Sequence, residues 1–138
     1  MNNATHFSAE HTLDVAASPE AIWRLFADVS GWKSWNAGIE EIQIMGPFAK
    51  GTEFNMKPPG QDAFTSRLTD VRENERFVDE TCVGDLVVTV THVLQKLDGG
   101  RTRVVYAIDA RGPEAEHIGP AISADFPDVL RALAATVS

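Results

Sequence analysis

Polar side chains interrupt the apolar faces of several segments in which apolar and polar residues alternate. Among them, His11, His92 and Tyr106 have the most useful chemistry. An imidazole titrates near neutral pH and a phenol donates a hydrogen bond, so these groups could anchor a ligand or exchange a proton with it. In the alternative interpretation, both histidines are core residues bonded to backbone groups or hydroxyls. The alternation places shorter polar residues on the same faces: Ser66, Asp79 and Thr81.

A possible charged pair involves Arg67 on one segment and Asp79 or Glu80 on the next. A buried pair of this kind could orient a carbonyl or enolate. The alternative is an exposed salt bridge, which would contribute little to stability. The candidate catalytic residues are therefore His11, His92, Tyr106 and Arg67.

Other site chemistries have no signature in the sequence. The histidines, His6, His11, His92 and His117, show no close pair and no carboxylate at metal-ligand spacing, so no metal is expected. Catalytic Ser-His-Asp or Cys-His patterns are also missing, and no motif implies a cofactor. Cys82 is the one cysteine, so no intrachain disulfide can form, and we expect it to be a small buried hydrophobe.

The segments that must position these residues alternate with a period of two, which is typical of half-buried strands. They predict strands at 7–15, 39–45, 52–57, 64–71, 76–83, 86–97 and 101–111. The loops after residue 39 are short and rich in turn residues, which favours an antiparallel meander. Asp98-Gly99-Gly100 is the clearest hairpin signal, because its glycines tolerate positive φ.

Helical signals follow the first strand. Ser18 is a good N-cap and Pro19 suits the first helical position, so a helix is predicted over about 19–28. A short helical turn carrying Trp32 and Trp35 is expected next.

The last part of the chain, from residue 113, also has a helical period. One stripe collects its apolar residues: Ile118, Ile122, Phe126, Val129, Leu130, Leu133 and Val137. Pro120 and Pro127 interrupt it, so we prefer a broken long helix. The break could be a kink, a boundary near Gly119, or a new start at Pro127.

The composition of the chain limits the classes of protein to which it can belong. The chain has 138 residues, of which 43% are hydrophobic, which suits a single globular domain over 1–138. A formal charge of −8 argues against nucleic acid as a partner. No apolar run approaches the roughly 20 residues of a membrane span, and the first residues lack the regions of a signal peptide. The expectation is a cytoplasmic monomer or homodimer.

The order of the elements and several local motifs resemble those of the START-like superfamily, in particular its polyketide cyclase/dehydrase-like proteins. The segment Val15–Trp23 resembles the opening of these proteins, Trp32-Lys33-Ser34-Trp35 their W-x-x-W turn, and Gly51-Thr52 the start of their third strand. Residues 94–104 resemble their hairpin, with Arg101 inserted. The resemblance implies an α+β helix-grip fold: a curved seven-stranded antiparallel sheet wrapped around a long C-terminal helix, with two short helices after the first strand.

The resemblance also implies a cavity between the sheet and the C-terminal helix. In this fold, the first and sixth strands flank the seventh, so His11 and His92 could approach one another. Gly119, Ala121 and Ala124 on the helix would leave space there. The expected ligand-binding residues are Trp32, Trp35, Phe54, Met56, Phe64, Ser66, Thr81, His92, Tyr106, Ile122 and Phe126. For both tryptophans, the alternative role is to close the base of the sheet.

Three functions remain open at this stage. The first is binding of a small hydrophobic molecule of polyketide, aromatic or lipid-like character. The second is a polyketide cyclase, aromatase or dehydratase that uses a cavity histidine as general acid or base, with Tyr106 or Arg67 polarising a carbonyl. The third is an interaction protein with a filled core, which needs no cavity.

Overall fold

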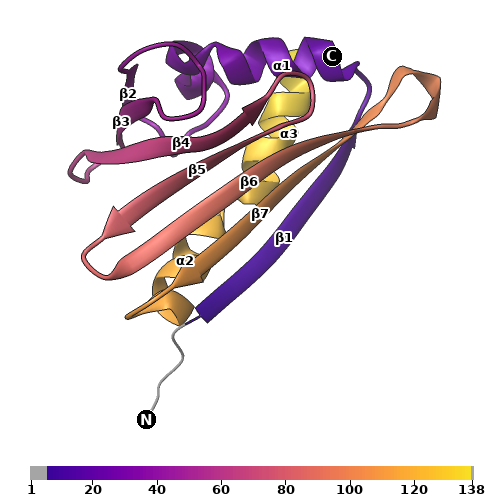
Figure 1. The fold of residues 1–138 in the computed structure, drawn as a ribbon. Coiled ribbons are helices and arrows are strands. Elements are labelled where there is room, and N and C mark those ends of the chain that lie inside the picture. Colours follow the sequence, from indigo (N-terminus) through magenta and orange to yellow (C-terminus); the bar gives the residue numbers. More distant parts are fainter. Residues whose placement is uncertain (1–5, 138) are drawn as a thin grey trace.

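The computed structural model describes residues 6–137 and has the predicted helix-grip fold. Its seven strands form one antiparallel sheet in the order β1-β7-β6-β5-β4-β3-β2 (Figure 1). Its elements are β1 (His6–Val15), α1 (Pro19–Ala27), η1 (Val29–Ser34), β2 (Glu41–Ile44), β3 (Glu53–Lys57), β4 (Phe64–Arg72), β5 (Arg76–Val83), β6 (Leu86–Lys96), η2 (Asp98–Gly100), β7 (Thr102–Arg111), α2 (Ala115–Ser123) and α3 (Phe126–Val137).

The start of α1 forms as its sequence predicts. The Ser18 hydroxyl accepts a hydrogen bond from the backbone N–H of Ala21 at 3.2 Å, and Pro19 is the first helical residue. The predicted turn that follows is the 3₁₀ helix η1. Its Trp32 side chain donates a hydrogen bond from Nε1 to the Phe26 carbonyl at 2.9 Å. This bond ties η1 back to α1.

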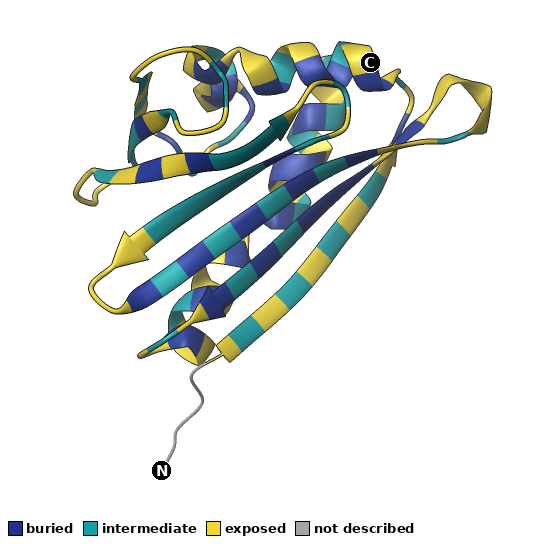
Figure 2. Ribbon diagram, viewed as in Figure 1, coloured by how far each residue is buried: buried dark blue, intermediate teal, exposed yellow. Residues whose placement is uncertain are grey.

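One face of the sheet is covered by helices. Helix α2 contacts β1 and β7, and α3 contacts β1 and lies behind the sheet in Figure 1. Burial alternates along β6 as the period-two pattern predicts, with every second residue from Leu86 to Leu94 buried (Figure 2). The face toward the helices is called the inner face below.

The C-terminal helix is broken, as expected, and the break at residues 124–125 agrees within one residue with the alternative of a new start at Pro127. Pro127 is the second residue of α3, where its missing N–H removes no intrahelical bond. Pro120 lies inside α2, where it can remove only a bond to the exposed first turn of that helix. The chain therefore tolerates Pro120 in a helix, and the predicted boundary near Gly119 is wrong.

A β-bulge in β4 changes which residues face inward. Ser66 pairs with Thr81 and Leu68 with Asp79, but Asp70 then pairs with Val78. Thr69 is therefore the extra residue of β4. This register settles the orientation of β5, because it puts Asp79 on the inner face opposite the fully buried Leu68.

Candidate functional site

A row of four aromatic side chains crosses the inner face of the sheet. In the strand register, Phe77 pairs with His92, His92 with Tyr106, and Tyr106 with His11. The Phe77 and His92 rings stack with centroids 3.9 Å apart, and the His92 and Tyr106 rings meet edge to face at 4.6 Å. His11 and His92 thus both face inward as expected, but Tyr106 separates them.

Phe126, the first residue of α3, packs against this row. Its ring centroid lies 5.5 Å from that of Tyr106 and 6.0 Å from that of His11. Both contacts are edge to face, the arrangement that aromatic pairs prefer. Phe126 is therefore a packing contact between helix and sheet in the predicted site region.

His92 is a buried histidine with a backbone partner. Its Nδ1 donates to the Phe77 carbonyl at 3.2 Å, and only 8% of the residue is exposed. Burial lowers the pKa of His92 to about 3, although the bond to Phe77 acts in the opposite direction. His92 is therefore neutral near pH 7 and holds its proton too weakly to serve as a general acid. This geometry matches the alternative interpretation of a core histidine.

Asp79 is a second ionisable group at this site. Its side chain is 15% exposed, and its Oδ2 lies 3.9 Å from Nδ1 of His92. Within residues 6–137, no protein group donates a hydrogen bond to its carboxyl. Burial raises the pKa of Asp79 to about 7. Alternation places Asp79 on the inner face with Phe77 and Thr81, but its only expected role was as a partner of Arg67, and it was not included in the expected catalytic or ligand-binding sets.

Tyr106 adds a second buried polar group. Only 4% of the residue is exposed. Burial, together with the charge of Asp79, raises the pKa of its phenol, so Tyr106 remains a hydrogen-bond donor at all physiological pH values. Among the described residues, its hydroxyl has no hydrogen-bond partner. Asp79 and Tyr106 are therefore two neighbouring polar groups that the protein itself leaves unsatisfied.

The inner face of β3–β5 is covered unevenly, since Phe54, Ser66, Leu68 and Phe77 are buried and other inward residues are not. The C-terminal helices make their main contacts with β1 and β7. Met56, Phe64 and Thr81, which all have inward parity, are only half-buried. The hydroxyls of Thr81 and the buried Ser66 hydrogen-bond to one another at 2.6 Å. Thr81 lies two residues from Asp79 on β5. Ser66 lies two residues from Leu68, which is the β4 partner of Asp79.

Three expected ligand-binding residues are buried in the hydrophobic core. Trp32 and Trp35 are 7% and 6% exposed, and Phe54 is 2% exposed. The Trp32 ring stacks on Phe77 at 5.6 Å and meets Phe54 edge to face at the same centroid distance. The tryptophans thus close one end of the sheet, which was their alternative role.

Two other expected site residues do not join this group. Arg67 is exposed on the outer face of β4, where its register partner is Glu80, because alternation puts it opposite to Ser66 and Leu68. It cannot polarise a ligand on the inner face. Ile122 is 39% exposed, because the face that α2 buries is formed by Ala115, Gly119 and Ser123.

Two further expectations are wrong for related reasons. A Cβ on Gly119 would lie 2.3 Å from the Phe7 ring, so the space expected there is already filled by a side chain from β1. Ala121 and Ala124 are exposed. Cys82 is exposed as well, because it has outward parity near the end of β5, where Val83 is also 58% exposed.

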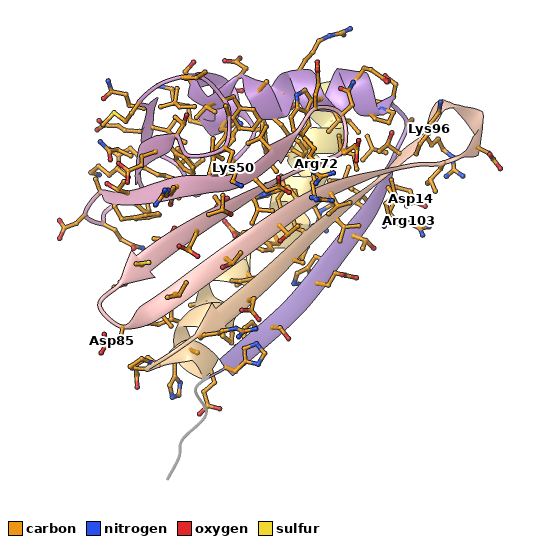
Figure 3. All side chains as sticks on the ribbon, in the orientation of Figure 1. Asp14, Lys50, Arg72, Asp85, Lys96 and Arg103 are labelled. Atoms are coloured by element: carbon orange, nitrogen blue, oxygen red, sulfur yellow. The ribbon has the colours of Figure 1, made fainter. Side chains whose placement is uncertain are left out.

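A hollow of about 550 Å³ does occur on the sheet, but not where the cavity was expected. It is lined by residues of the outer face, including Glu10, Thr12 and Gln95. Arg103 and Asp14 lie together in it, as Figure 3 shows, and their Nε and Oδ1 atoms are 2.8 Å apart. Two of its charged groups, Asp14 and Arg103, are thus already paired.

Neither a metal site nor a membrane-spanning helix occurs in the described part of the chain. Within residues 6–137, no group of three or more histidine, cysteine or acidic side chains could hold a metal ion. No helix in the same range is long and apolar enough to cross a membrane.

The fold and this inner-face arrangement define a helix-grip protein, and comparisons with known proteins agree. A family model described as polyketide cyclase/dehydrase and lipid transport matches residues 6–138. The chain belongs to this family. No curated protein shows significant sequence similarity to it.

Solved structures with the same fold include two enzymes. The Zhui aromatase/cyclase from Streptomyces sp. R1128 is 19% identical, with a TM-score of 0.82 over 96% of this chain and 93% of that chain. A norcoclaurine synthase from Thalictrum flavum is 17% identical, with a TM-score of 0.78 over 99% and 97%. A START superfamily protein from Mycobacterium smegmatis is 18% identical, with a TM-score of 0.76 over 94% and 96%.

Proposed function

We propose that this protein binds a small hydrophobic molecule with one polar end on the inner face of β3–β5. The observation that carries the proposal is that the buried Tyr106 hydroxyl and the Asp79 carboxyl, whose side chain is only 15% exposed, have no hydrogen-bond partner among the described residues. Buried polar groups are normally satisfied, because desolvation without a partner costs free energy. A bound ligand would supply the missing partner.

The surroundings of these groups suit an apolar ligand. Met56 and Phe64 are half-buried on the inner faces of β3 and β4, and the Ser66–Thr81 hydroxyl pair adjoins them. Ligand sites are commonly apolar with a few polar groups that fix orientation. The family description, which names lipid transport beside cyclases, is consistent with a ligand of this kind.

A second candidate function is catalysis of cyclase or dehydratase type. The observation that favours it is the pKa of Asp79 at about 7, because such a carboxyl can both give and accept a proton at neutral pH. Tyr106 would donate a hydrogen bond to a substrate carbonyl. This version replaces the histidine base and Arg67 by Asp79 and Tyr106. Its support from related proteins is the aromatase/cyclase of the same fold.

Binding of Nile red, a neutral apolar dye, tests the primary proposal. We expect the dye to bind the native protein, and Thr81→Trp to weaken binding by about tenfold because it fills the inner face beside Ser66. Thr89→Trp is the matched control, since Thr89 is half-buried on the opposite face of β6. Dye binding that T81W leaves unchanged, in a folded variant, would contradict the site. Absence of dye binding would favour the filled-core alternative.

Catalysis requires a separate measurement. Asp79→Asn should keep Nile red binding but abolish conversion of a polyketide carbonyl substrate, followed by mass spectrometry. If D79N converts the substrate as fast as the parent, Asp79 is not the proton-transfer group.

A further inference from the structure

The carboxyl group of Asp79 has no lysine or arginine partner in the protein. All Lys and Arg side chains lie within the described residues, and those that are exposed lie outside the core, among them Lys50, Arg72 and Lys96 (Figure 3). Only Lys57 and Arg76 are half-buried. Lys57 pairs with Glu40 at 2.9 Å and Arg76 with Asp70 at 2.8 Å. No lysine or arginine is therefore available to Asp79. The other histidine of the inner face, His11, lies on β1 beyond Tyr106 in the strand register.

The groups that face Asp79 are weakly charged or uncharged. From β6 it faces His92, which is neutral near pH 7, and from β7 the phenol of Tyr106. From β4 it faces Leu68. The ionisable residues of the C-terminal helices are exposed: Glu116, His117, Asp128 and Arg131. Asp125, between these helices, lies against Gly38 instead.

We infer that the ligand of this site carries a cationic group, such as a protonated amine, that pairs with the carboxylate of Asp79. This inference rests on the proposed binding function and specifies its polar end. A buried carboxylate attracts a cation more strongly than a solvated one, because the local dielectric is low. The net charge of −8 adds to the preference for a positive ligand.

Anionic, neutral and cationic ligands should respond differently to the charge of Asp79. A carboxylate-bearing ligand, such as a fatty-acid anion, would place like charge beside Asp79 without any cation to offset it. A neutral carbonyl ligand would accept a hydrogen bond from protonated Asp79 and from Tyr106, and its affinity would fall as Asp79 ionises. A cationic ligand requires the ionised carboxylate, so its affinity rises with pH through about 7.

Three naphthyl compounds of similar shape test the inference. Naphthylethylamine has a cationic end, naphthylethanol a neutral end and naphthylacetate an anionic end. By titration calorimetry at about pH 8, where Asp79 is ionised, we expect the amine to bind at least about tenfold more tightly than the alcohol, and the acetate to bind most weakly. Equal binding of amine and alcohol, or tighter binding of the alcohol, would overturn the inference.

Two variants test whether the preference for the amine over the alcohol depends on Asp79. Asp79→Asn should bring the affinities for the amine and the alcohol to within about twofold of each other. Glu80→Gln removes the same formal charge from the next residue of β5, on the outer face, and should preserve the preference. Loss of the preference in E80Q as well would show a general charge effect rather than a pair at Asp79.

Proton release provides a test without any variant. At about pH 6, Asp79 is mostly protonated in the free protein, so binding the amine should release up to one proton. Calorimetry in two buffers of different ionisation enthalpy measures that proton. Binding of the amine without release would contradict the pairing. If none of the three compounds nor Nile red binds, the proposed function fails; if naphthylethanol binds without an amine preference, only this inference fails.

Discussion

Two neighbouring parts of the inner face differ sharply in how well the protein fills them. The aromatic cluster of Trp23, Phe26, Trp32, Phe48, Phe54 and Phe77 is held by edge-to-face and stacked contacts with ring centroids 5.0–6.5 Å apart. The polar patch of Asp79, Tyr106, Ser66 and Thr81 lies beside it. Phe77 and Asp79 are only two residues apart on β5, yet one is 2% exposed within a complete ring cluster and the other lacks a partner.

Residues that stabilise the fold and residues of the proposed binding site thus lie side by side on a single strand. Rings from α1, η1, β3 and β5 fill the aromatic cluster, so its burial contributes to folding. In the polar patch, desolvated groups oppose folding unless something pairs with them. A site that is unfavourable for stability is a common cost of function.

The largest effect is expected in the aromatic cluster. Phe26 is fully buried and packs against Phe77 at 5.0 Å, so Phe26→Ala should lower the free energy of unfolding by about 3–5 kcal/mol. Phe64→Ala is the matched control, because Phe64 is half-buried beside the polar patch and should cost clearly less. Urea denaturation measures both values. Equal losses would mean that the two parts of the inner face are filled equally.

The second prediction concerns the pH dependence of stability. Folding raises the pKa of Asp79 from 3.8 to about 7, so the folded protein holds this proton more tightly than the unfolded chain. The resulting destabilisation is absent below about pH 4, grows as the pH rises, and is complete above about pH 7. Because asparagine does not ionise, D79N should exceed the parent in stability by up to about 4 kcal/mol above neutral pH and be about equal at low pH.

Thermal or urea unfolding of D79N and the parent at a series of pH values measures this difference. His92 acts in the opposite sense, since its pKa falls to about 3 and its stabilisation is lost as the pH falls from 6.5. Because His92 lies 3.9 Å from Asp79, the two proteins need not share that loss equally, so the difference is read above pH 6.5, where His92 is neutral in the folded and the unfolded state. A constant difference between D79N and the parent across the pH range would mean that Asp79 ionises as easily in the folded protein as in the unfolded chain.

The strands and the residues at their inner positions could largely be predicted from the sequence. Alternation along β1, β6 and β7 places His11, His92 and Tyr106 on the inner face, and it does so because these long strands pair without a bulge. The hairpin at Asp98–Gly100 also forms, with positive φ at Gly99 and Gly100.

The pairing of polar groups could not be predicted in the same way. Alternation places Asp79 with Ser66 and Thr81, but the sequence also offered a charged pair of Asp79 or Glu80 with Arg67, and the strand register excludes that pair for Asp79 by placing Arg67 opposite Glu80 on the outer face. Likewise, an apolar stripe cannot show where a helix breaks, and the break at residues 124–125 leaves Ile122 exposed. These features depend on contacts between elements that local spacing does not encode.

A third, smaller effect is expected where α2 meets β1. A Cβ on Gly119 would lie 2.3 Å from the Phe7 ring, so Gly119→Ala should destabilise by about 1–3 kcal/mol despite its higher helix propensity. Phe7→Ala in the same chain should remove most of that added loss. Chemical denaturation of the single and double variants measures the coupling. A stabilised G119A would show that the Phe7 ring moves aside easily.

The smallest effect is expected at the hydroxyl pair of the polar patch. Ser66 is buried, and its Oγ lies 2.6 Å from Oγ1 of Thr81, so Ser66→Ala should cost about 1 kcal/mol because it leaves the Thr81 hydroxyl without its partner. Replacing both partners, with Ser66→Ala and Thr81→Val, should recover part of that loss, since no hydroxyl is then left unpaired. Double-mutant denaturation curves measure the recovery.

The double variant also tests which group of the polar patch determines ligand preference. If the polar patch binds ligands through the charge of Asp79, it should keep its preference for naphthylethylamine over naphthylethanol, because the carboxyl is untouched. If the hydroxyl pair instead receives the polar end, the preference should disappear while stability changes little. In that case the polar patch would contain residues that set ligand selectivity but contribute little to stability. Phe77 and Asp79 show the same division of roles on one strand.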